Sequence, residues 1–478
     1  MRRLLALALL LAALAAPASP ARSGEAGPAT LRREGRFLVD AHGRVVLLHG
    51  VNAVWKRPPY VPPATPAGFT VKDADWIAAQ GFNTVRLGVV FAGVMPARGK
   101  VDQAYLDRIA KLVDLLAARR VWVLLDFHQD LFNERFAGEG FPDWAVHEDG
   151  LPTPVSAGFP GNYFQPSTSR AFDNFYANVD GVADLYAQAW KAVARRFRQT
   201  PYVLGYDLMN EPWPGTQAAS CANPAGCPVF DGQVLQPVFA KALAAIRSVD
   251  PRHLVWVEPN VLFNNGAQTQ LGDLHDGLVG LSYHQYCTVA GFTHSAGGKA
   301  GPECGPQGDL VVANANSTAE QRGWATLLTE FGASDDLADV ARVVASADKG
   351  LTGWQYWHYK EWADPTTESQ GSGGQGLFAH DGDLASAKQA KLDVLVVPFA
   401  RAVAGVPTAA GFSDHVFTLE YDAKPSTGLT EVWVPTRQYP RGYRVSAVGA
   451  TVVSEPGATV LLLRAAEAGP VRVTITPR

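Results

Sequence analysis

Polar side chains stand where apolar runs of the sequence end. The residues in such positions are Arg86, Asp126, His128, Asn210, Glu211, His284, Tyr286 and Glu330. A charge buried at a strand end needs a partner or a shifted pKa, so charges that converge there indicate a reactive site. Glu211 and Glu330 suggest a definite chemistry, because two carboxyl groups on opposite sides of a glycosidic bond can cleave it. One is protonated and assists the leaving oxygen, while the other is ionised and attacks the anomeric carbon.

Eight apolar runs position these residues, and longer amphipathic segments separate the runs. The runs are Val45–Gly50, Thr84–Val90, Val121–Phe127, Val203–Met209, Leu254–Glu258, Leu278–Tyr283, Thr326–Thr329 and Leu351–Tyr356. Continuous apolar runs are typical of strands buried on both faces, with helices as parallel crossovers between them. We therefore expect an α/β fold with a (β/α)8 TIM barrel over residues 30–400. Its fourth and seventh strands would carry Glu211 and Glu330 to opposite sides of the barrel mouth.

Other segments complete the predicted organisation. Asp102–Arg119 and Asp184–Phe197 have the apolar spacing of helices that pack on a barrel, and Gln129–Ser169 and Ala290–Gln321 are expected to be long loops. Beyond about residue 405, short alternating strands punctuated by Pro, Gly and Asp predict an antiparallel β-sandwich over residues 405–478. We interpret this second domain as accessory.

The first 21 residues have the pattern of a signal peptide. Two arginines precede an apolar run that is too short to span a bilayer, and small residues with prolines follow it up to Ala21. We therefore expect a secreted, extracellular protein. The 41 basic and 45 acidic residues give a net charge of −4, which offers no electrostatic basis for binding nucleic acid. We also expect a monomer.

Four cysteines form two locally spaced pairs, Cys221 with Cys227 and Cys287 with Cys304. In an exported chain this spacing favours two short-loop disulfides, although four cysteines permit three connectivities. A zinc site built from all four cysteines would have closer partners. No His-Glu-x-x-His motif supports a metal at His128, His284 and the nearby acids, so we expect neither a metal nor a cofactor.

The order and spacing of these residues resemble those of a known family. The set Arg86, His128, Asn210-Glu211-Pro212, His284-x-Tyr286 and Glu330 is similar to glycoside hydrolase family 5, of the 4/7 superfamily of retaining enzymes. The resemblance covers about residues 36–400, and it implies that Glu211 is the acid/base and Glu330 the nucleophile. A retaining mechanism requires the two carboxyl groups to lie about 5 to 5.5 Å apart.

The remaining site residues have expected roles beside this pair. Asn210 is expected to bind the sugar 2-hydroxyl, and Arg86 and Tyr286 to hold Glu330 ionised and oriented. His128 and His284 would bind sugar hydroxyls or support the acid/base. Trp357 is expected to stack on a sugar, with Trp354 buried. Glu258, Asp126 and Asp207 are interpreted as supporting carboxylates rather than catalysts.

A narrower resemblance points to endoglycoceramidases, which cut between an intact glycan and ceramide. The segments that carry it are Val51–Tyr60, Asp126–Phe132 and Gly205–Gly215. It implies a glycolipid substrate, transient contact with a lipid surface or micelle, and contacts from Lys56 and Asp130 to the glycan. Loop residues proposed to face the lipid are Phe91, Val94, Met95, Leu131, Phe132, Phe136, Phe141, Trp144 and Trp213, or else they pack their own loops.

Three other functions stay open. A glucanase or mannanase of the same family would share the two glutamates but have an open, aromatic-lined groove. A galactosylceramide-type or steryl-glucoside hydrolase would alter only the sugar pocket. A non-catalytic carbohydrate-binding protein would be expected to lack one of the two acids, and this chain has both.

Overall fold

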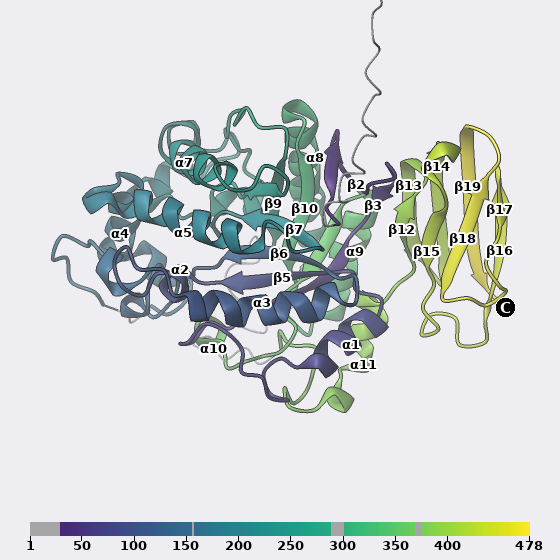
Figure 1. Ribbon diagram of the computed structural model, residues 1–478, viewed down its shortest axis with the longest axis horizontal. Coiled ribbons are helices and arrows are strands. Elements are labelled where there is room, and N and C mark those ends of the chain that lie inside the picture. The colour runs from purple at the N-terminus through teal and green to yellow at the C-terminus, as the bar shows by residue number, and fades with distance from the viewer. Residues whose placement is uncertain (1–28, 155–156, 288–300, 369–373) are drawn as a thin grey trace, which may run out of the picture.

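Eight parallel strands close into a barrel in the order β10-β11-β4-β5-β6-β7-β8-β9. The computed structural model describes residues 29–154, 157–287, 301–368 and 374–478, and Figure 1 shows the arrangement of the elements. The barrel strands are β4 (His49–Ala53), β5 (Thr84–Val89), β6 (Trp122–Phe127), β7 (Val203–Asp207), β8 (Leu254–Val257), β9 (Val279–Gln285), β10 (Ala325–Phe331) and β11 (Gly353–Tyr356). Every one of these strands is almost wholly buried, which explains their continuous apolar sequences and confirms the predicted TIM barrel.

Helices pack around the barrel between most of its strands. They are α1 (Val71–Ala79), α2 (Phe91–Val94), α3 (Gln103–Ala117), α4 (Pro166–Tyr176), α5 (Val182–Phe197), α6 (Ala218–Cys221), α7 (Gln236–Arg247), α8 (Cys304–Arg322), α9 (Leu337–Lys349), α10 (Pro365–Glu368) and α11 (Gln389–Leu395). Between β8 and β9, where every residue is described, a 3-10 turn at Val261–Asn265 replaces an α-helix. Side chains of this turn, among them Asn264, therefore lie close to the barrel mouth.

The helix α3 illustrates how sequence pattern becomes packing. The Asp102 side chain caps its first turn by accepting from the Tyr105 N–H, and Leu106, Ile109 and Val113 form part of its buried face. The helices predicted at Asp102–Arg119 and Asp184–Phe197 are confirmed as α3 and α5 within two residues at each end.

Two antiparallel sheets lie beside the barrel (Figure 1, green to yellow, with the N-terminal strands of one sheet in purple). One contains β13 (Gly405–Ser413), β14 (Val416–Ala423), β16 (Tyr443–Val448) and β19 (Gly469–Pro477). The other contains β1 (Arg32–Glu34), β2 (Phe37–Val39), β3 (Val45–Val46), β12 (Phe399–Val403), β15 (Thr430–Trp433), β17 (Ala450–Val452) and β18 (Val460–Ala465). His49, the first residue of β4, stacks on Phe399 at 3.9 Å between ring centroids, so the sheets contact the barrel end where the strands begin.

Two sequence predictions about elements need correction. Val45–Gly50 is not one barrel strand: Val45–Val46 pair with β12 in the seven-stranded sheet, and the barrel strand starts at His49. The run is continuous in apolarity because Val45 and Leu47 enter the core of the C-terminal sheets while Val46 and Leu48 enter the core at the barrel end. Most of the expected loop Ala290–Gln321 forms the helix α8. Residues 290–300 lie outside the described residues.

Both expected disulfides are present, Cys221 to Cys227 and Cys287 to Cys304, and they confirm the predicted pairing. The second ties the end of β9 to the start of α8. Within the described part of the chain, none of the helices combines the length and apolarity that crossing a bilayer requires. The predicted signal peptide, residues 1–21, lies outside the described residues.

Candidate active site

Glu211 and Glu330 meet at the end of the barrel where the strands finish. Glu330 belongs to β10, and Glu211 lies just after β7. An oxygen of Glu211, an oxygen of Glu330 and a ring nitrogen of His284 all lie within 4.8 Å of one another. The oxygens of the two carboxyl groups therefore approach to a distance that suits double displacement better than the wider gap of an inverting enzyme.

Glu330 is held by donors at both of its oxygens. Arg86 Nη1 lies 2.5 Å from Oε1, and the Tyr286 hydroxyl donates to Oε2 at 2.9 Å. Burial raises the pKa of Glu330 above its ordinary value, and the positive charge of Arg86 opposes this rise. The two donors fix the orientation of the carboxylate and favour its ionised form, as a nucleophile requires.

Arg86 is completely buried and connects Glu330 to the strands around it. Its guanidinium donates to Asp207 Oδ2 at 2.9 Å and to Asn210 Oδ1 at 3.0 Å, and it pairs with Asp126 Oδ1 at 3.0 Å. Three carboxylates therefore surround one cation, which offsets the large cost of burying it. This arrangement agrees with the supporting positions expected for Asp126 and Asp207.

Glu211 has an unusual backbone and an asymmetric environment. Its φ of +42° lies in the left-handed region, which is costly for a residue with a side chain, and its N–H donates to Glu258 Oε2 at 3.0 Å. Its Oε1 faces His284 Nδ1 at 2.9 Å and the Asn264 amide nitrogen at 3.4 Å. Asn264 was not predicted as a site residue, because its only signal in the sequence is its place in the connection after β8.

The carboxyl group of Glu211 differs from that of Glu330 in its affinity for protons. Burial raises the pKa of Glu211 to about 7, and the negative charge of Asp130 adds to the rise. No arginine hydrogen bond to its carboxylate is present among the described residues, in contrast to Glu330. Glu211 therefore retains a proton near neutral pH, as a general acid must.

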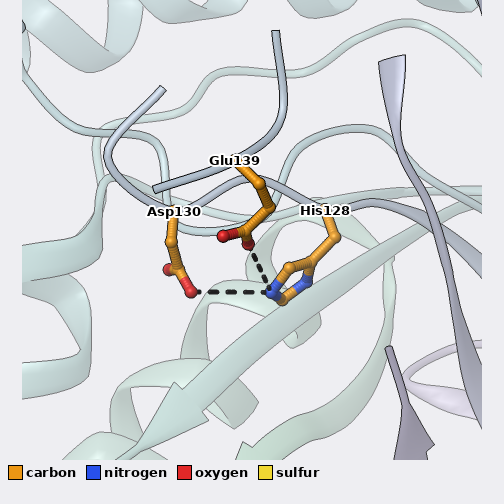
Figure 2. Close-up of side chains that lie close together, drawn as sticks. All are labelled: His128, Asp130 and Glu139. Carbon is orange, nitrogen blue, oxygen red and sulfur yellow. Dashed lines mark ion pairs between the residues drawn. The ribbon is translucent and has the colours of Figure 1, made fainter. Parts of the chain in front are cut away.

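A second polar group lies beside the carboxyl pair. Figure 2 shows Asp130 and Glu139 directed at the ring of His128, whose Nε2 lies 3.8 Å and 3.9 Å from their nearest oxygens. Lys56 Nζ lies 2.5 Å from Asp130 and 4.6 Å from the ring centroid of Trp357. Glu139, which was not predicted as a site residue, is fully buried and is joined to Asp130 by a backbone β-bridge.

Among the residues that the structure describes, two side-chain groups have a composition that could hold a metal: His128 with Asp130 and Glu139, and Glu211 with His284 and Glu330. A side-chain cation already contacts each group, since Lys56 pairs with Asp130 and Arg86 pairs with Glu330. A divalent ion would be repelled by these cations, so we assign a metal to neither group.

One cavity joins these residues to an apolar wall. Its polar part includes Lys56, His128, Asp130, Asn210, Glu211, Tyr286 and Glu330, together with the Trp357 ring. Its apolar part includes Phe159, Pro160, Tyr163, Phe164, Trp213, Val261 and Leu262. The structure thus brings the predicted site residues together, with His284 behind them in contact with Glu211, and buries Trp354 as expected.

Of the two interpretations given for the aromatic and apolar loop residues, the structure supports packing within the loops for most of them. Of the nine residues proposed to face the lipid, only Trp213 lines the cavity. Phe91, Val94, Met95, Leu131, Phe132, Phe136 and Phe141 are almost completely buried, and Trp144 donates from its indole to the Met95 carbonyl at 3.0 Å. Phe132 stacks on Phe141 at 3.9 Å between ring centroids, so these side chains pack their own loop. The wall consists of Trp213 together with residues from Phe159 to Phe164 and from the turn after β8.

Comparison with known proteins gives concordant matches. A family model described as Cellulase (glycosyl hydrolase family 5) matches residues 39–361, and the glycoside hydrolase family 5 C-terminal domain matches residues 398–476. Endoglycoceramidase I of Rhodococcus hoagii (strain 103S) is 36% identical over 462 residues, covering 93% of this chain and 88% of the relative.

Two solved structures of Endo-glycoceramidase II from Rhodococcus sp. are also similar. Its complex with ganglioside GM3 is 29% identical with a TM-score of 0.78, covering 93% of this chain and all of that chain. Its lactosyl-enzyme intermediate is 30% identical with a TM-score of 0.77, covering 92% of this chain and 99% of that chain.

Proposed function

The chain belongs to glycosyl hydrolase family 5 and is a glycoside hydrolase, and from this premise we propose that it hydrolyses the bond between the glycan and the ceramide of glycosphingolipids. The observation that carries the proposal is the cavity, in which the two glutamates stand between a polar part and an apolar wall. A polysaccharide hydrolase would need sugar-binding surfaces on both sides of the glutamates. The similar proteins named endoglycoceramidases support the same substrate.

We propose that cleavage proceeds with retention, in two displacements. In the first, the Glu330 carboxylate attacks the anomeric carbon while Glu211 gives its proton to the glycosidic oxygen, which leaves as the ceramide hydroxyl. In the second, Glu211 takes a proton from water, the water oxygen bonds to the anomeric carbon, and Glu330 is released. Forming the ester removes the charge of Glu330, which favours loss of the proton from Glu211 between the steps.

The polar part of the cavity is proposed to bind the glycan. Asn210 donates one amide hydrogen to the Gln129 carbonyl at 3.0 Å, which leaves a second hydrogen for the sugar 2-hydroxyl. Lys56, Asp130 and His128 offer charged donors and acceptors to hydroxyl groups farther along the glycan, with Trp357 as a flat surface for stacking. Tyr286 and His284 then orient the two carboxyl groups rather than the sugar.

The proposed mechanism predicts a bell-shaped dependence of kcat/KM on pH. Glu211 must be protonated, so activity falls as pH rises through its pKa of about 7. Glu330 must be ionised, so activity also falls as pH drops towards a pKa that burial raises above its ordinary value of 4.5. We expect the alkaline midpoint near pH 7, measured as initial rates on a soluble lactoside with an alkyl leaving group. An alkaline midpoint at the ordinary pKa of lysine or tyrosine would contradict Glu211 as the acid.

We propose that the apolar wall receives the ceramide and that its rim contacts the lipid surface. Phe164 is 60% exposed, and its ring meets Trp213 edge-on at 4.9 Å between centroids. An aromatic side chain exposed at the mouth of an apolar cavity favours contact with acyl chains.

Replacing Phe164 with Ser should raise KM for a glycosphingolipid in mixed micelles by about tenfold, because partial burial of a Phe against lipid stabilises by about 1.5 kcal/mol. The kcat/KM for a soluble aryl lactoside should change little, since that substrate does not reach the rim. The matched control is Val448→Ser, which removes a side chain of similar exposure, 67%, from β16 in the C-terminal domain. Equal effects of Phe164→Ser on both substrates would contradict a lipid-binding role.

The substrate is tested by incubation with a ganglioside, a glucosylceramide, a galactosylceramide, a steryl glucoside and a soluble β-glucan. We expect an intact oligosaccharide and ceramide from the ganglioside. Cleavage of the β-glucan alone would make the protein a polysaccharide hydrolase, and cleavage of only the galactosylceramide or steryl glucoside would assign it to those substrates. Binding without turnover of any of them would favour a carbohydrate-binding protein.

We further propose that the enzyme acts outside the cell as a monomer. Two disulfides in a chain of this size support an oxidising compartment, and the apolar N-terminal segment supports export. The mass of the protein recovered from culture medium tests export, since cleavage after Ala18 or Ala21 is expected. Light scattering of the purified protein tests its oligomeric state.

A further inference from the structure

A third glutamate, Glu258, lies directly behind the proposed acid/base. It follows β8 and is completely buried. Its Oε2 accepts the Glu211 N–H at 3.0 Å and lies 3.5 Å from His284 Nε2. Its Oε1 and the His284 Nε2 atom are both buried without a hydrogen-bond partner. Buried polar groups normally find partners, so this contact calls for a physical explanation.

Glu258 lacks a cation that would stabilise its ionised form. In the ranges that the structure describes, the ion pairs formed by Lys and Arg do not include Glu258, and its one ion-pair contact within 4.0 Å is with the ring of His284. Arg86 acts only from a greater distance, while the acids Glu211 and Asp207 face the same space. Burial raises the pKa of Glu258 well above its ordinary value, and the charges of Glu211 and Asp207 add to the rise. Complete burial without a Lys or Arg partner therefore favours the neutral carboxylic acid form of Glu258.

The two oxygens of Glu211 are not equivalent. The Asn264 side-chain oxygen accepts from the backbone N–H of His284 at 3.0 Å. This contact turns the Asn264 amide nitrogen towards Glu211 Oε1 as a donor. His284 Nδ1 faces the same oxygen at 2.9 Å. If Nδ1 also carries a proton, both donors point at Oε1, and the proton of Glu211 must then lie on Oε2.

The tautomer of His284 decides which oxygen of Glu211 carries the proton. Burial lowers the pKa of His284 to about 3, so the ring is neutral and carries a single proton. With the proton on Nδ1, Nε2 needs a donor, and a hydroxyl at Glu258 Oε2 is the group placed to supply it. With an ionised Glu258, the ring proton would instead move to Nε2, and Nδ1 would accept the proton of Glu211 and withdraw it from the leaving oxygen.

We propose that Glu258, as a neutral acid, donates to His284 Nε2 and thereby fixes the Nδ1–H tautomer that, with Asn264, keeps the catalytic proton of Glu211 on Oε2. Glu258 is a positioning residue, because it acts through His284 and through the strained backbone of Glu211. This proposal rests on the proposed function of Glu211 as the acid/base.

The variant Glu258→Gln separates this role from simple packing. A hydroxyl at the Oε2 position accepts from the Glu211 N–H and donates to His284 Nε2 at the same time. An amide group presents either its oxygen or its nitrogen at that position, so it can keep one of these two contacts and not both. If the amide oxygen of the new side chain keeps the contact with the Glu211 N–H, His284 loses its donor, while the side chain at position 258 keeps its shape and stays neutral.

The tautomer is measured directly by NMR of the free enzyme labelled with 15N-histidine, with His284→Asn used to assign the signal. We expect the proton on Nδ1 in the wild type and on Nε2 in Glu258→Gln. A wild-type His284 with its proton on Nε2 would overturn the proposal whatever the variant does, so a variant that fails to fold does not leave the proposal untested.

Kinetics give an independent readout. Glu258→Gln should lower kcat at least tenfold on a glycosphingolipid, and at most by the factor of about 10² to 10⁴ that general acid catalysis contributes. On a lactoside with a leaving group that needs no protonation, the loss should stay below about threefold. Equal losses on both substrates would show a merely structural role and overturn the proposal. Absence of turnover by the wild type would instead refute the proposed function and leave the tautomer measurement valid.

Discussion

Replacement of Glu330 with Gln should lower kcat/KM by about 10⁴-fold or more, the scale of effect expected when a covalent nucleophile is removed. The amide has the same shape but cannot form the sugar ester. The Tyr286 contact can persist, and Arg86 keeps its other carboxylate partners, Asp126 and Asp207. The variant should therefore remain folded and still bind glycolipid, which calorimetry can measure alongside the rates.

The control for this variant is Glu148→Gln, which neutralises a glutamate paired with Arg135 on the loop after β6, away from the cavity. Its activity should remain within about twofold of the wild type. Ordinary turnover by a correctly folded Glu330→Gln would show that another group attacks the anomeric carbon, and the assignment of Glu330 would then be wrong.

Replacement of Glu211 with Ala should have the second largest effect, and the size should depend on the leaving group. With a glycosphingolipid, whose ceramide oxygen needs a proton, kcat should fall by about 10² to 10⁴-fold. With a dinitrophenyl lactoside the first step needs no acid, so the ester on Glu330 should accumulate and limit the rate. Azide, which needs no general base, should then restore turnover and give a glycosyl azide of retained configuration.

The azide experiment distinguishes Glu211 from its neighbour Glu258. Removal of Glu258 leaves the carboxyl of Glu211 in place as a base for water, so azide should give little acceleration in Glu258→Gln. If azide accelerated Glu258→Gln and left Glu211→Ala unchanged, Glu258 would be the acid/base and Glu211 a supporting residue.

Sequence alone predicted the carboxyl pair because a parallel barrel gathers the ends of its strands at one face. Arg86, Asn210 and Tyr286 were recognisable by the same rule, and Arg86 and Tyr286 contact Glu330 as expected. The contact of Asn210 with Arg86 was not predicted. Their positions depend on strand order and register, which the apolar runs encode. The catalytic roles of these residues stay predictions until the variants are measured.

The apolar wall could not be derived in this way. Phe141 and Phe164 both lie in the long segment after β6, yet one is almost completely buried and the other is 60% exposed. Nothing in a loop sequence without periodicity shows which aromatic side chain turns inward. The same limit applies to Asn264, whose partner Glu211 comes from a distant segment of the chain. It applies also to Glu139, which meets His128 only because the loop after β6 folds back and pairs Glu139 with Asp130.

The incorrect assignment of Val45 and Val46 to a barrel strand has a related cause. The run from Val45 to Leu48 is uniformly apolar because it passes from the core of the C-terminal sheets to the core at the barrel end. A run that serves two cores in succession has the same pattern as one buried strand. Only the pairing of Val45 and Val46 with β12 separates the two cases.

The central claim is that Glu330 forms a covalent bond to the sugar. Incubation with a lactosyl fluoride that carries fluorine in place of the 2-hydroxyl should slow both steps and trap the intermediate, because the fluorine destabilises the oxocarbenium-like transition states. Mass spectrometry of the digested protein should then find one lactosyl adduct, on the peptide that contains Glu330. An adduct on the peptide of Glu211 or Glu258, or release of a product with inverted configuration, would contradict the account.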